Sequence, residues 1–257
     1  MNPIFATPAA APAISAPSPV NRLQLARERL IVALDVPDAA AAAALVSKLD
    51  GTCLWFKVGL ELFTAAGPAV LEPLIHRGHS VFLDLKFHDI PNTVAGAVRS
   101  AAALGVNMLT IHASGGPAML IAAHTALADL TNPPQLLAVT MLTSIDQAQA
   151  HAIGYDRSPS DQAFLLARMG LDAGINGFVC SPQEVGAIRA LAGPDAILVV
   201  PGIRPAGTDL GDQKRVSTPA ETLRLGASYL VVGRPITQAA DPAQAASQIL
   251  NEMAETL

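Results

Sequence analysis

The stretch SVFLDLKFHDIPNTV, residues 80–94, decides the fold of this chain. Apolar residues dominate its first eight positions, which predicts a buried β-strand over residues 80–87. Charged residues enter toward the strand end, and Pro91 stands where the next element begins. Proline is favoured at the first position of a helix, so we expect a helix to start there. A buried strand that passes directly into a helix is typical of a βα unit.

The same pattern recurs along the chain, so that short β-rich runs alternate with Ala- and Leu-rich helical runs. The expected strands are 29–36, 53–59, 80–87, 108–113, 135–142, 177–180, 196–202 and 229–235. The expected helices are 38–49, 60–77 with a break at Gly67-Pro68, 91–104, 115–129, 159–173, 182–192, 217–226 and 241–255. Nearly continuous apolar strands in βα units predict a parallel sheet covered by helices.

Two architectures contain such a sheet. One is an open doubly wound sheet, but no G-x-G-x-x-G follows the first expected strand. Eight repeats in about 230 residues favour an α/β fold of the other kind, a single-domain (β/α)8 TIM barrel over residues 22–257. Residues 1–21 are rich in Ala and Pro, and we expect a flexible, disordered extension there. They lack the basic start and the uninterrupted apolar region of a signal peptide.

Composition argues against several classes of partner. The 257-residue chain is 51% hydrophobic and 14% charged, with a net charge of −5 and no run of Lys or Arg. We therefore expect no nucleic-acid partner and no attachment to an anionic membrane surface. No apolar run reaches the roughly 20 residues of a membrane-spanning helix. Cys53 and Cys180 lie far apart without a Cys or His motif, which indicates core thiols in a cytoplasmic protein.

Polar residues gather where the expected strands end, whereas the first halves of the same strands are almost purely apolar. Active sites of (β/α)8 barrels lie at the carboxyl ends of the strands. Scattered structural ion pairs would not sort to one end, so this pattern indicates a site. The residues concerned are Asp35, Lys57, Asp84, Lys86, His112, Thr140, Thr143, Pro201, Gly202, Gly233 and Arg234.

The third expected strand carries the densest charge. Because side chains alternate along a strand, Asp84, Lys86 and His88 are expected on one face. Lys57 joins them from the neighbouring strand and Asp35 from the strand beyond. An unlike pair at about 4 Å attracts by roughly 4 kcal/mol at an effective dielectric near 20, so this Asp/Lys array would hold its members charged and oriented. A purely structural salt-bridge network is the alternative.

A second group of residues predicts an anion site. Residues 201–215 supply glycines, Gln213 and three cations, and Gly233-Arg234 follow the last strand. Loops at these positions of a barrel frequently bind phosphate. A solvated loop with a turn glycine is the alternative. No HxH or HExxH spacing suggests a metal site. The residues alone thus predict a metal-free barrel enzyme for a small phosphorylated molecule.

Six motifs occur in a fixed order between residues 31 and 237: VALDVPD, FKVGLELF, LDLKFHDIPNTV, TMLTS, VVPGIRP with GDQKR, and VVGRPIT. Together they resemble the orotidine 5'-phosphate decarboxylase family. The resemblance implies conversion of orotidine 5'-phosphate to UMP and CO2, the last step of de novo pyrimidine nucleotide biosynthesis. It also implies a homodimer and a reaction without a cofactor.

The resemblance assigns roles to particular residues. Lys86 resembles the proton donor to C6 of the pyrimidine, and Asp84 the group beside the departing carboxylate. Lys57 resembles the link from Asp84 to a ribose hydroxyl, with Asp35 also near the ribose. The other implied contacts are Thr143 with the base, Arg204, Gln213, Gly233 and Arg234 with the phosphate side, and Asp89, Ile90 and Thr93 with the partner's site.

Two other functions remain open at this point. Metal-dependent sugar-phosphate decarboxylases and aldol-type synthases of the same superfamily share the Asp-x-Lys-x-x-Asp spacing of residues 84–89. The region of Thr143 and the GDQKR segment favour the nucleotide enzyme. The other possibility is a catalytically dead binding or scaffold barrel, which the complete charged array disfavours.

Overall fold

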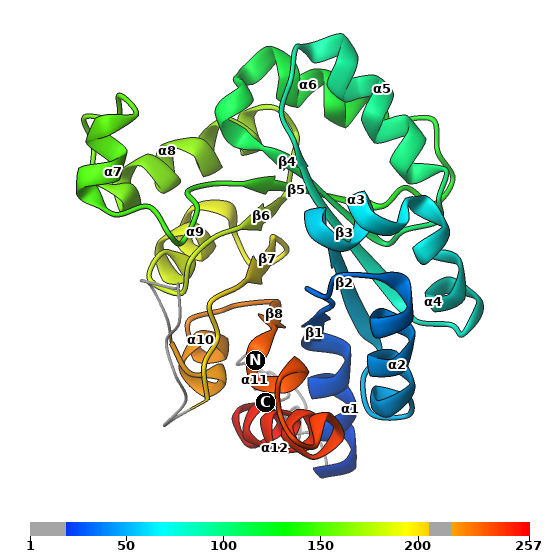
Figure 1. Cartoon of the computed structure of the whole chain (residues 1–257). Coiled ribbons are helices and arrows are strands. Elements are labelled where there is room, and N and C mark those ends of the chain that lie inside the picture. The colour runs from blue at the N-terminus through cyan, green and yellow to red at the C-terminus, as the bar shows by residue number, and fades with distance from the viewer. Residues whose placement is uncertain (1–18, 206–216) are drawn as a thin grey trace, which may run out of the picture.

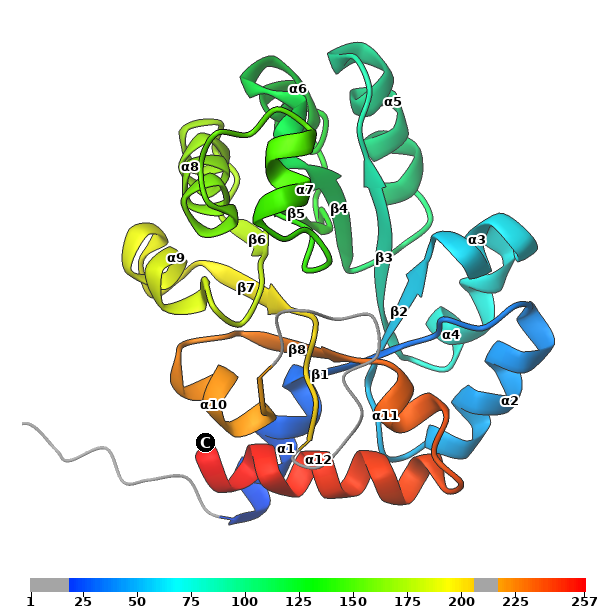
Figure 2. The ribbon, with the colours of Figure 1, turned by 60° about the vertical axis from the view of Figure 1, so that its left-hand side comes forward.

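The computed structural model describes residues 19–205 and 217–257. Eight parallel strands close into a barrel in chain order, from β1 next to β2 around to β8 next to β1. Helices lie outside this ring of strands (Figure 1, Figure 2). The predicted (β/α)8 TIM barrel is therefore confirmed.

Every expected strand is present, although most are shorter than the apolar runs that predicted them. Apolar residues continue beyond the end of the strand, as Met141 and Leu142 do after β5, and there they line a cavity. The strands are β1 Leu30–Ala33, β2 Trp55–Gly59, β3 Ser80–Phe87, β4 Met108–His112, β5 Gln135–Val139, β6 Gly177–Val179, β7 Ile197–Val200 and β8 Tyr229–Val232.

The helices begin with the caps that the sequence supplies. Asp38 and Asp241 each accept a hydrogen bond from a backbone N–H of the first turn that follows, and proline stands at the start of several helices. The helices between β1 and β6 are α2 Ala39–Leu49, α3 Leu60–Ala66, α4 Glu72–His76, α5 Pro91–Ala102, α6 Pro117–Thr125, α7 Gln147–Ala152 and α8 Pro159–Asp172, with 3-10 turns η1 Pro68–Val70 and η2 Ala113–Gly115. After β6 come α9 Val185–Ala192, α10 Pro219–Arg224, α11 Arg234–Thr237 and α12 Pro242–Thr256.

Three helices were not expected from the sequence: α1 Pro19–Arg29, α7 and α11. α1 packs beside α12 and buries only Ala26 (Figure 2). A helix that buries so little needs no wide apolar stripe, and without that stripe its sequence does not predict a helix. Residues 19–21, which we assigned to the extension, begin α1, so that boundary was wrong; residues 1–18 lie outside the described residues. The strand expected over 229–235 was also too long, because Gly233 ends it and α11 starts at Arg234.

Two apolar layers position the site. One fills the space between the strands and the surrounding helices, and the other fills the barrel interior. The interior layer consists of Ile31, Ala33, Phe82, Met108, Leu137, Val199 and Val231. On β3, Asp84 follows Phe82 by two residues and therefore stands directly above this layer. Side chains at this level face the open end of a packed barrel.

Both cysteines are buried, and they form no disulfide with each other. Burial raises the pKa of the Cys53 thiol to about 12, although the nearby charge of Arg27 acts in the opposite direction. Cys53 is thus the unreactive core thiol that we expected, whereas Cys180 lies at the cavity wall. Within residues 19–205 and 217–257, no helix combines the length and apolar character needed to cross a bilayer.

Gly170 of α8 allows the helix to lie directly on β6. A Cβ atom at this position would lie 2.7 Å from Cε1 of Phe178, a fully buried ring. We expect Gly170→Ala to destabilise the fold by about 1–3 kcal/mol through overpacking, measured by thermal or chemical unfolding.

The matched control is Gly186→Ala in α9, where the nearest atom to the new Cβ would be 3.9 Å away. This substitution should be neutral or stabilising by less than about 1 kcal/mol. Equal stabilities of the two variants would contradict the packing of α8 on β6.

Candidate active site

A cavity of about 480 Å³ opens at the carboxyl ends of the strands. The structure brings most of the predicted site residues together there, although they come from six strand ends. The predicted residues that line it are Asp35, Lys57, Asp84, Lys86, Thr143, Pro201, Gly202, Arg204, Gly233 and Arg234. Gln213 lies outside the described residues.

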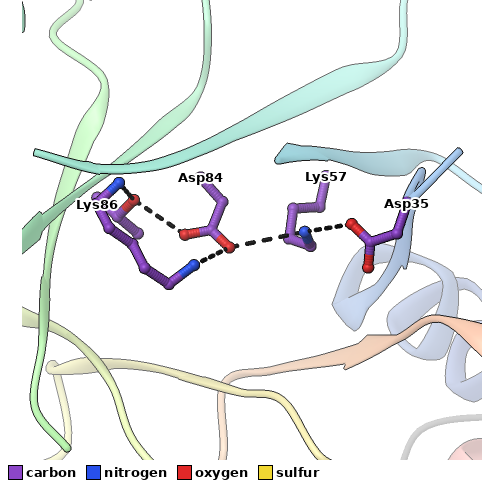
Figure 3. Close-up of polar contacts among 5 residues, drawn as sticks. Asp35, Lys57, Asp84 and Lys86 are labelled. Atoms are coloured by element: carbon purple, nitrogen blue, oxygen red, sulfur yellow. Dashed lines mark hydrogen bonds and ion pairs between the residues drawn. The ribbon is translucent and has the colours of Figure 1, made fainter. Parts of the chain in front are cut away.

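The predicted Asp/Lys array is present at one wall of this cavity (Figure 3). Nζ of Lys86 lies 2.7 Å from Oδ2 of Asp84, and Nζ of Lys57 lies 3.7 Å from the same oxygen. Lys57 also donates to Oδ1 of Asp35 at 2.9 Å. The side chain of Asp35 is 55% exposed, so solvent screens that outer pair, while the Asp84 pairs are shielded. The charges alternate along β1, β2 and β3.

Asp84 is the buried centre of the array, with 8% of its surface exposed. Burial alone would raise the pKa of this carboxyl. The charges of Lys86 and Lys57, with hydrogen bonds from Lys86 and Thr110, outweigh burial and hold the pKa below its ordinary value. Asp84 is therefore a carboxylate, which can only accept hydrogen bonds, and it fixes the ammonium of Lys86 toward the cavity.

Lys57 reaches Asp84 because Gly59, two residues further along β2, has no side chain. A Cβ atom at Gly59 would lie 2.8 Å from Nζ of Lys57 and 3.4 Å from Oδ1 of Asp35. Gly59 is also the register partner of Asp84 on β3. The space above this glycine is thus the space that the Lys57 ammonium occupies.

Regular strand geometry ends at Asp84. β3 and β4 are in register at Leu83 and again at Phe87, but three residues of β3 stand opposite the single residue Thr110 of β4 between these points. Lys86 has φ 49°, and it is the one non-glycine residue with positive φ in the described parts of the chain. This left-handed conformation costs a residue with a Cβ roughly 1–2 kcal/mol.

The irregularity changes the prediction for His88. We expected it on the same face as Asp84 and Lys86, yet it is exposed and does not line the cavity. The period of two holds only in a regular strand, and β3 ends at Phe87. The ring of His88 lies beside that of His112, with centroids 5.5 Å apart. Burial lowers the pKa of His112, and the charges of His88 and Lys86 lower it further, whereas the charge of Asp84 acts in the opposite direction. The net pKa is below the ordinary value, so His112 is neutral near pH 7.

Asp89, Ile90 and Thr93 do not line the cavity of their own chain. All three are exposed, Ile90 with 68% of its surface, at the start of α5. Oδ1 of Asp89 accepts a hydrogen bond from the N–H of Ile90 at 2.6 Å. The place that we expect for these three residues in a partner's site stays a prediction.

The predicted anion-binding residues stand next to the array. Gly233 stands between β8 and α11, and a Cβ atom there would lie 3.8 Å from Oδ2 of Asp35. Arg234 is exposed at the cavity, whereas Arg204 is buried and its Nη1 donates to the carbonyl of Ile203 at 2.9 Å. Both arginines therefore line the cavity that also contains the alternating charges.

Sequence reasoning missed several residues of the site. Thr110 is fully buried within an apolar run, where a threonine gives no sign of a role beyond that of an ordinary strand residue. Other missed residues follow the same strands as the predicted ones, so their positions in the sequence could have indicated them. These additional cavity residues include Met141, Leu142, Ser144, Thr237 and Gln238.

Comparisons with known proteins point to one family. A family model described as orotidine 5'-phosphate decarboxylase / HUMPS family matches residues 28–249. A relative named orotidine 5'-phosphate decarboxylase from Moorella thermoacetica is 54% identical over 234 residues, which are 89% of this chain and 93% of the relative. A relative of the same name from Paramagnetospirillum magneticum is 53% identical over 227 residues, which are 86% of this chain and 97% of the relative.

A solved structure agrees with these sequences. The crystal structure of orotidine 5'-phosphate decarboxylase from Lactobacillus acidophilus has a TM-score of 0.77 and 39% sequence identity, covering 88% of this chain and 98% of that chain. The segment that the family model matches contains all eight strands and the whole charged array. The chain belongs to the orotidine 5'-phosphate decarboxylase / HUMPS family.

Proposed function

We propose that this chain decarboxylates orotidine 5'-phosphate to UMP and CO2, as the last step of de novo pyrimidine nucleotide biosynthesis. The observation that carries the proposal is the ionised Asp84 held between Lys57 and Lys86 in the wall of a cavity that also contains Arg204 and Arg234. The names of the relatives support the same reaction.

The cavity offers a place for each part of this substrate. The phosphate binds beside Gly233, where the backbone can approach an anion, and the guanidinium groups of Arg204 and Arg234 neutralise its charge. Gln213 lies outside the described residues, and the contact with the phosphate that the resemblance implies for it stays a prediction. The ribose lies near Asp35 and Lys57, and Thr143 contacts the base. This orientation places C6 of the pyrimidine at the Asp84–Lys86 pair.

The reaction breaks the bond between C6 and the carboxylate, and the electron pair stays on C6. That pair occupies an orbital in the plane of the ring, so the π-system cannot delocalise it and no cofactor serves as an electron sink. The ammonium of Lys86 stabilises the charge where it develops and then donates a proton to C6. CO2 leaves, UMP remains, and Lys86 regains its proton from solvent.

Asp84 has two parts in this proposal. It keeps the ammonium of Lys86 at hydrogen-bond distance, so that little reorganisation is needed when charge develops. It also stands beside the substrate carboxylate, and the repulsion between these like charges is relieved as CO2 departs. Binding of the remote phosphate supplies the energy that holds the two carboxylates together.

The alternative is a metal-dependent sugar-phosphate decarboxylase or aldol-type synthase. It shares the spacing of Asp84, Lys86 and Asp89, but the relatives described above carry the name of the nucleotide enzyme. In the described part of the chain, no group of three or more His, Cys, Asp or Glu side chains is arranged to bind a metal ion. A chelator separates the two functions directly.

The test is an assay of the purified full chain with orotidine 5'-phosphate, with and without a chelator of divalent cations. We expect release of CO2 and formation of UMP at the same rate in both conditions. Loss of turnover with the chelator would favour the metal-dependent alternative. UMP binding without any CO2 release would instead indicate a binding protein.

Lys86→Ala supplies the matched variant for this assay. It removes both the charge that stabilises C6 and the proton that C6 receives, so kcat should fall by several powers of ten, at least about 1000-fold. Circular dichroism and thermal unfolding check that the barrel is intact. Near-normal turnover by this variant refutes the role of Lys86.

We also propose that the active form is a homodimer in the cytoplasm. Asp89, Ile90 and Thr93 are exposed at the start of α5 and do not contribute to their own cavity, which supports a role in a neighbouring site. In a dimer with twofold symmetry, each subunit would insert these residues into the partner's site. Asp89 then adds a carboxylate to the partner's array, and Ile90 covers apolar surface.

Mixing two inactive variants tests this sharing. In a hybrid of Lys86→Ala and Asp89→Ala chains, one site receives both intact residues and the other neither. Complete random exchange of subunits should therefore restore roughly a quarter of the wild-type activity. Turnover is measured after mixing, with each variant alone as the control.

Subunit exchange has to be demonstrated separately, for example by mass spectrometry of differently tagged chains. If hybrids form and activity stays at the level of the single variants, Asp89 does not act across the interface.

A further inference from the structure

The backbone of β3 is irregular at the residues that carry the chemistry. Asp84, Leu85 and Lys86 stand opposite Thr110 alone, and Lys86 has the positive φ described above. A strand residue normally bonds its backbone N–H to the neighbouring strand's backbone. Here the N–H of Lys86 donates to a side chain instead, to Oγ1 of Thr110 at 2.8 Å.

The same hydroxyl also contacts Asp84. Oγ1 of Thr110 lies 3.0 Å from Oδ1 of Asp84, while the other oxygen of that carboxylate is taken by the lysines. A carboxylate only accepts, so the single hydroxyl proton of Thr110 points to Asp84. The lone pairs of Oγ1 are then free to accept from the N–H of Lys86. Both hydrogen bonds are therefore satisfied together.

We propose that Thr110 is a positioning residue for catalysis, whose hydroxyl fixes the backbone of Lys86 and the carboxylate of Asp84 relative to each other. The inference rests on the proposed decarboxylation for its kinetic consequence. A left-handed Lys86 persists only if its surroundings hold it, and its partly buried N–H needs an acceptor. Thr110 supplies that acceptor, and it also orients the Asp84 carboxylate that accepts a hydrogen bond from the Lys86 ammonium.

The neighbouring strand end offers a matched control. Thr140 follows β5, is 3% exposed, and its Oγ1 donates to the backbone carbonyl of Val179 at 3.0 Å. The sequence predicted Thr140 at the site, but this was wrong, because Thr140 does not line the cavity and both its hydroxyl and its N–H donate to the carbonyl of Val179. Thr140→Val measures the general cost of losing a buried hydroxyl.

The experiment compares Thr110→Val, Thr110→Ser and Thr140→Val with the wild-type chain in steady-state decarboxylation of orotidine 5'-phosphate. Val keeps the shape of Thr110 and removes both hydrogen bonds, so kcat should fall about 100-fold while KM stays near the wild-type value. Ser keeps the hydroxyl and should retain most of kcat. Thr140→Val should retain wild-type kcat. Thr110→Ala replaces the Val variant if the latter fails to fold.

Three kinetic outcomes overturn the proposal. These are wild-type kcat in Thr110→Val, an equal loss in Thr110→Ser, or an equal loss in Thr140→Val. The second would assign the effect to the Thr110 methyl group, and the third to a general cost of hydroxyl removal.

A crystal structure of Thr110→Val tests the same idea without turnover. We expect φ of Lys86 to leave the left-handed region and the distance from Nζ to Oδ2 of Asp84 to exceed 2.7 Å. Unchanged geometry contradicts the positioning role even if the wild-type chain is active. Failure of the wild-type chain to decarboxylate the substrate removes the proposed function, and the crystallographic comparison still decides the role of Thr110.

Discussion

The ionised carboxylate of Asp84 between two lysines is the interaction on which the rest of the site depends. A buried carboxylate without partners costs several kcal/mol, so Asp84 is stable as an anion only because Lys86 and Lys57 lie at 2.7 and 3.7 Å. Lys86 is near Asp84 in the sequence, but Lys57 comes from β2, and only the folded barrel brings it to Asp84. The closed barrel supplies the arrangement, since its register places Asp84 beside Gly59 and brings Lys57 in above that glycine.

The same interaction couples folding to pH. The folded-state pKa of Asp84 lies below its ordinary value, so the unfolded chain binds a proton at this group more readily than the folded chain. The stability that Asp84 contributes is therefore fully present above its unfolded pKa and is lost as the pH falls through the lower, folded value. The site and the fold thus rely on one ionisation state, which is also the state that orients Lys86.

Much of the Asp/Lys array was predictable because charged residues occur at the carboxyl ends of the apolar strands and not at their beginnings. Asp35, Lys57 and Asp84 stand at the ends of apolar runs, and the period of two in regular strands predicts that they share one face of the sheet. The prediction of side-chain direction was wrong where the strand geometry of β3 is no longer regular. His88 does not lie on the predicted face because β3 becomes irregular after Leu83. The sequence also gives no signal for the left-handed conformation of Lys86, because lysine has no preference for positive φ. Thr110 was missed because threonine is common in strands and its role appears only in its contacts.

The central claim is that the two lysines outweigh burial at Asp84. The most direct measurement is a 13C NMR titration of the carboxyl carbons of the folded protein, with the Asp84 resonance assigned by its absence in Asp84→Asn. We expect Asp84 to remain ionised as the pH is lowered to the ordinary pKa of 3.8. Protonation of Asp84 above that value, while the barrel is still folded, would contradict it.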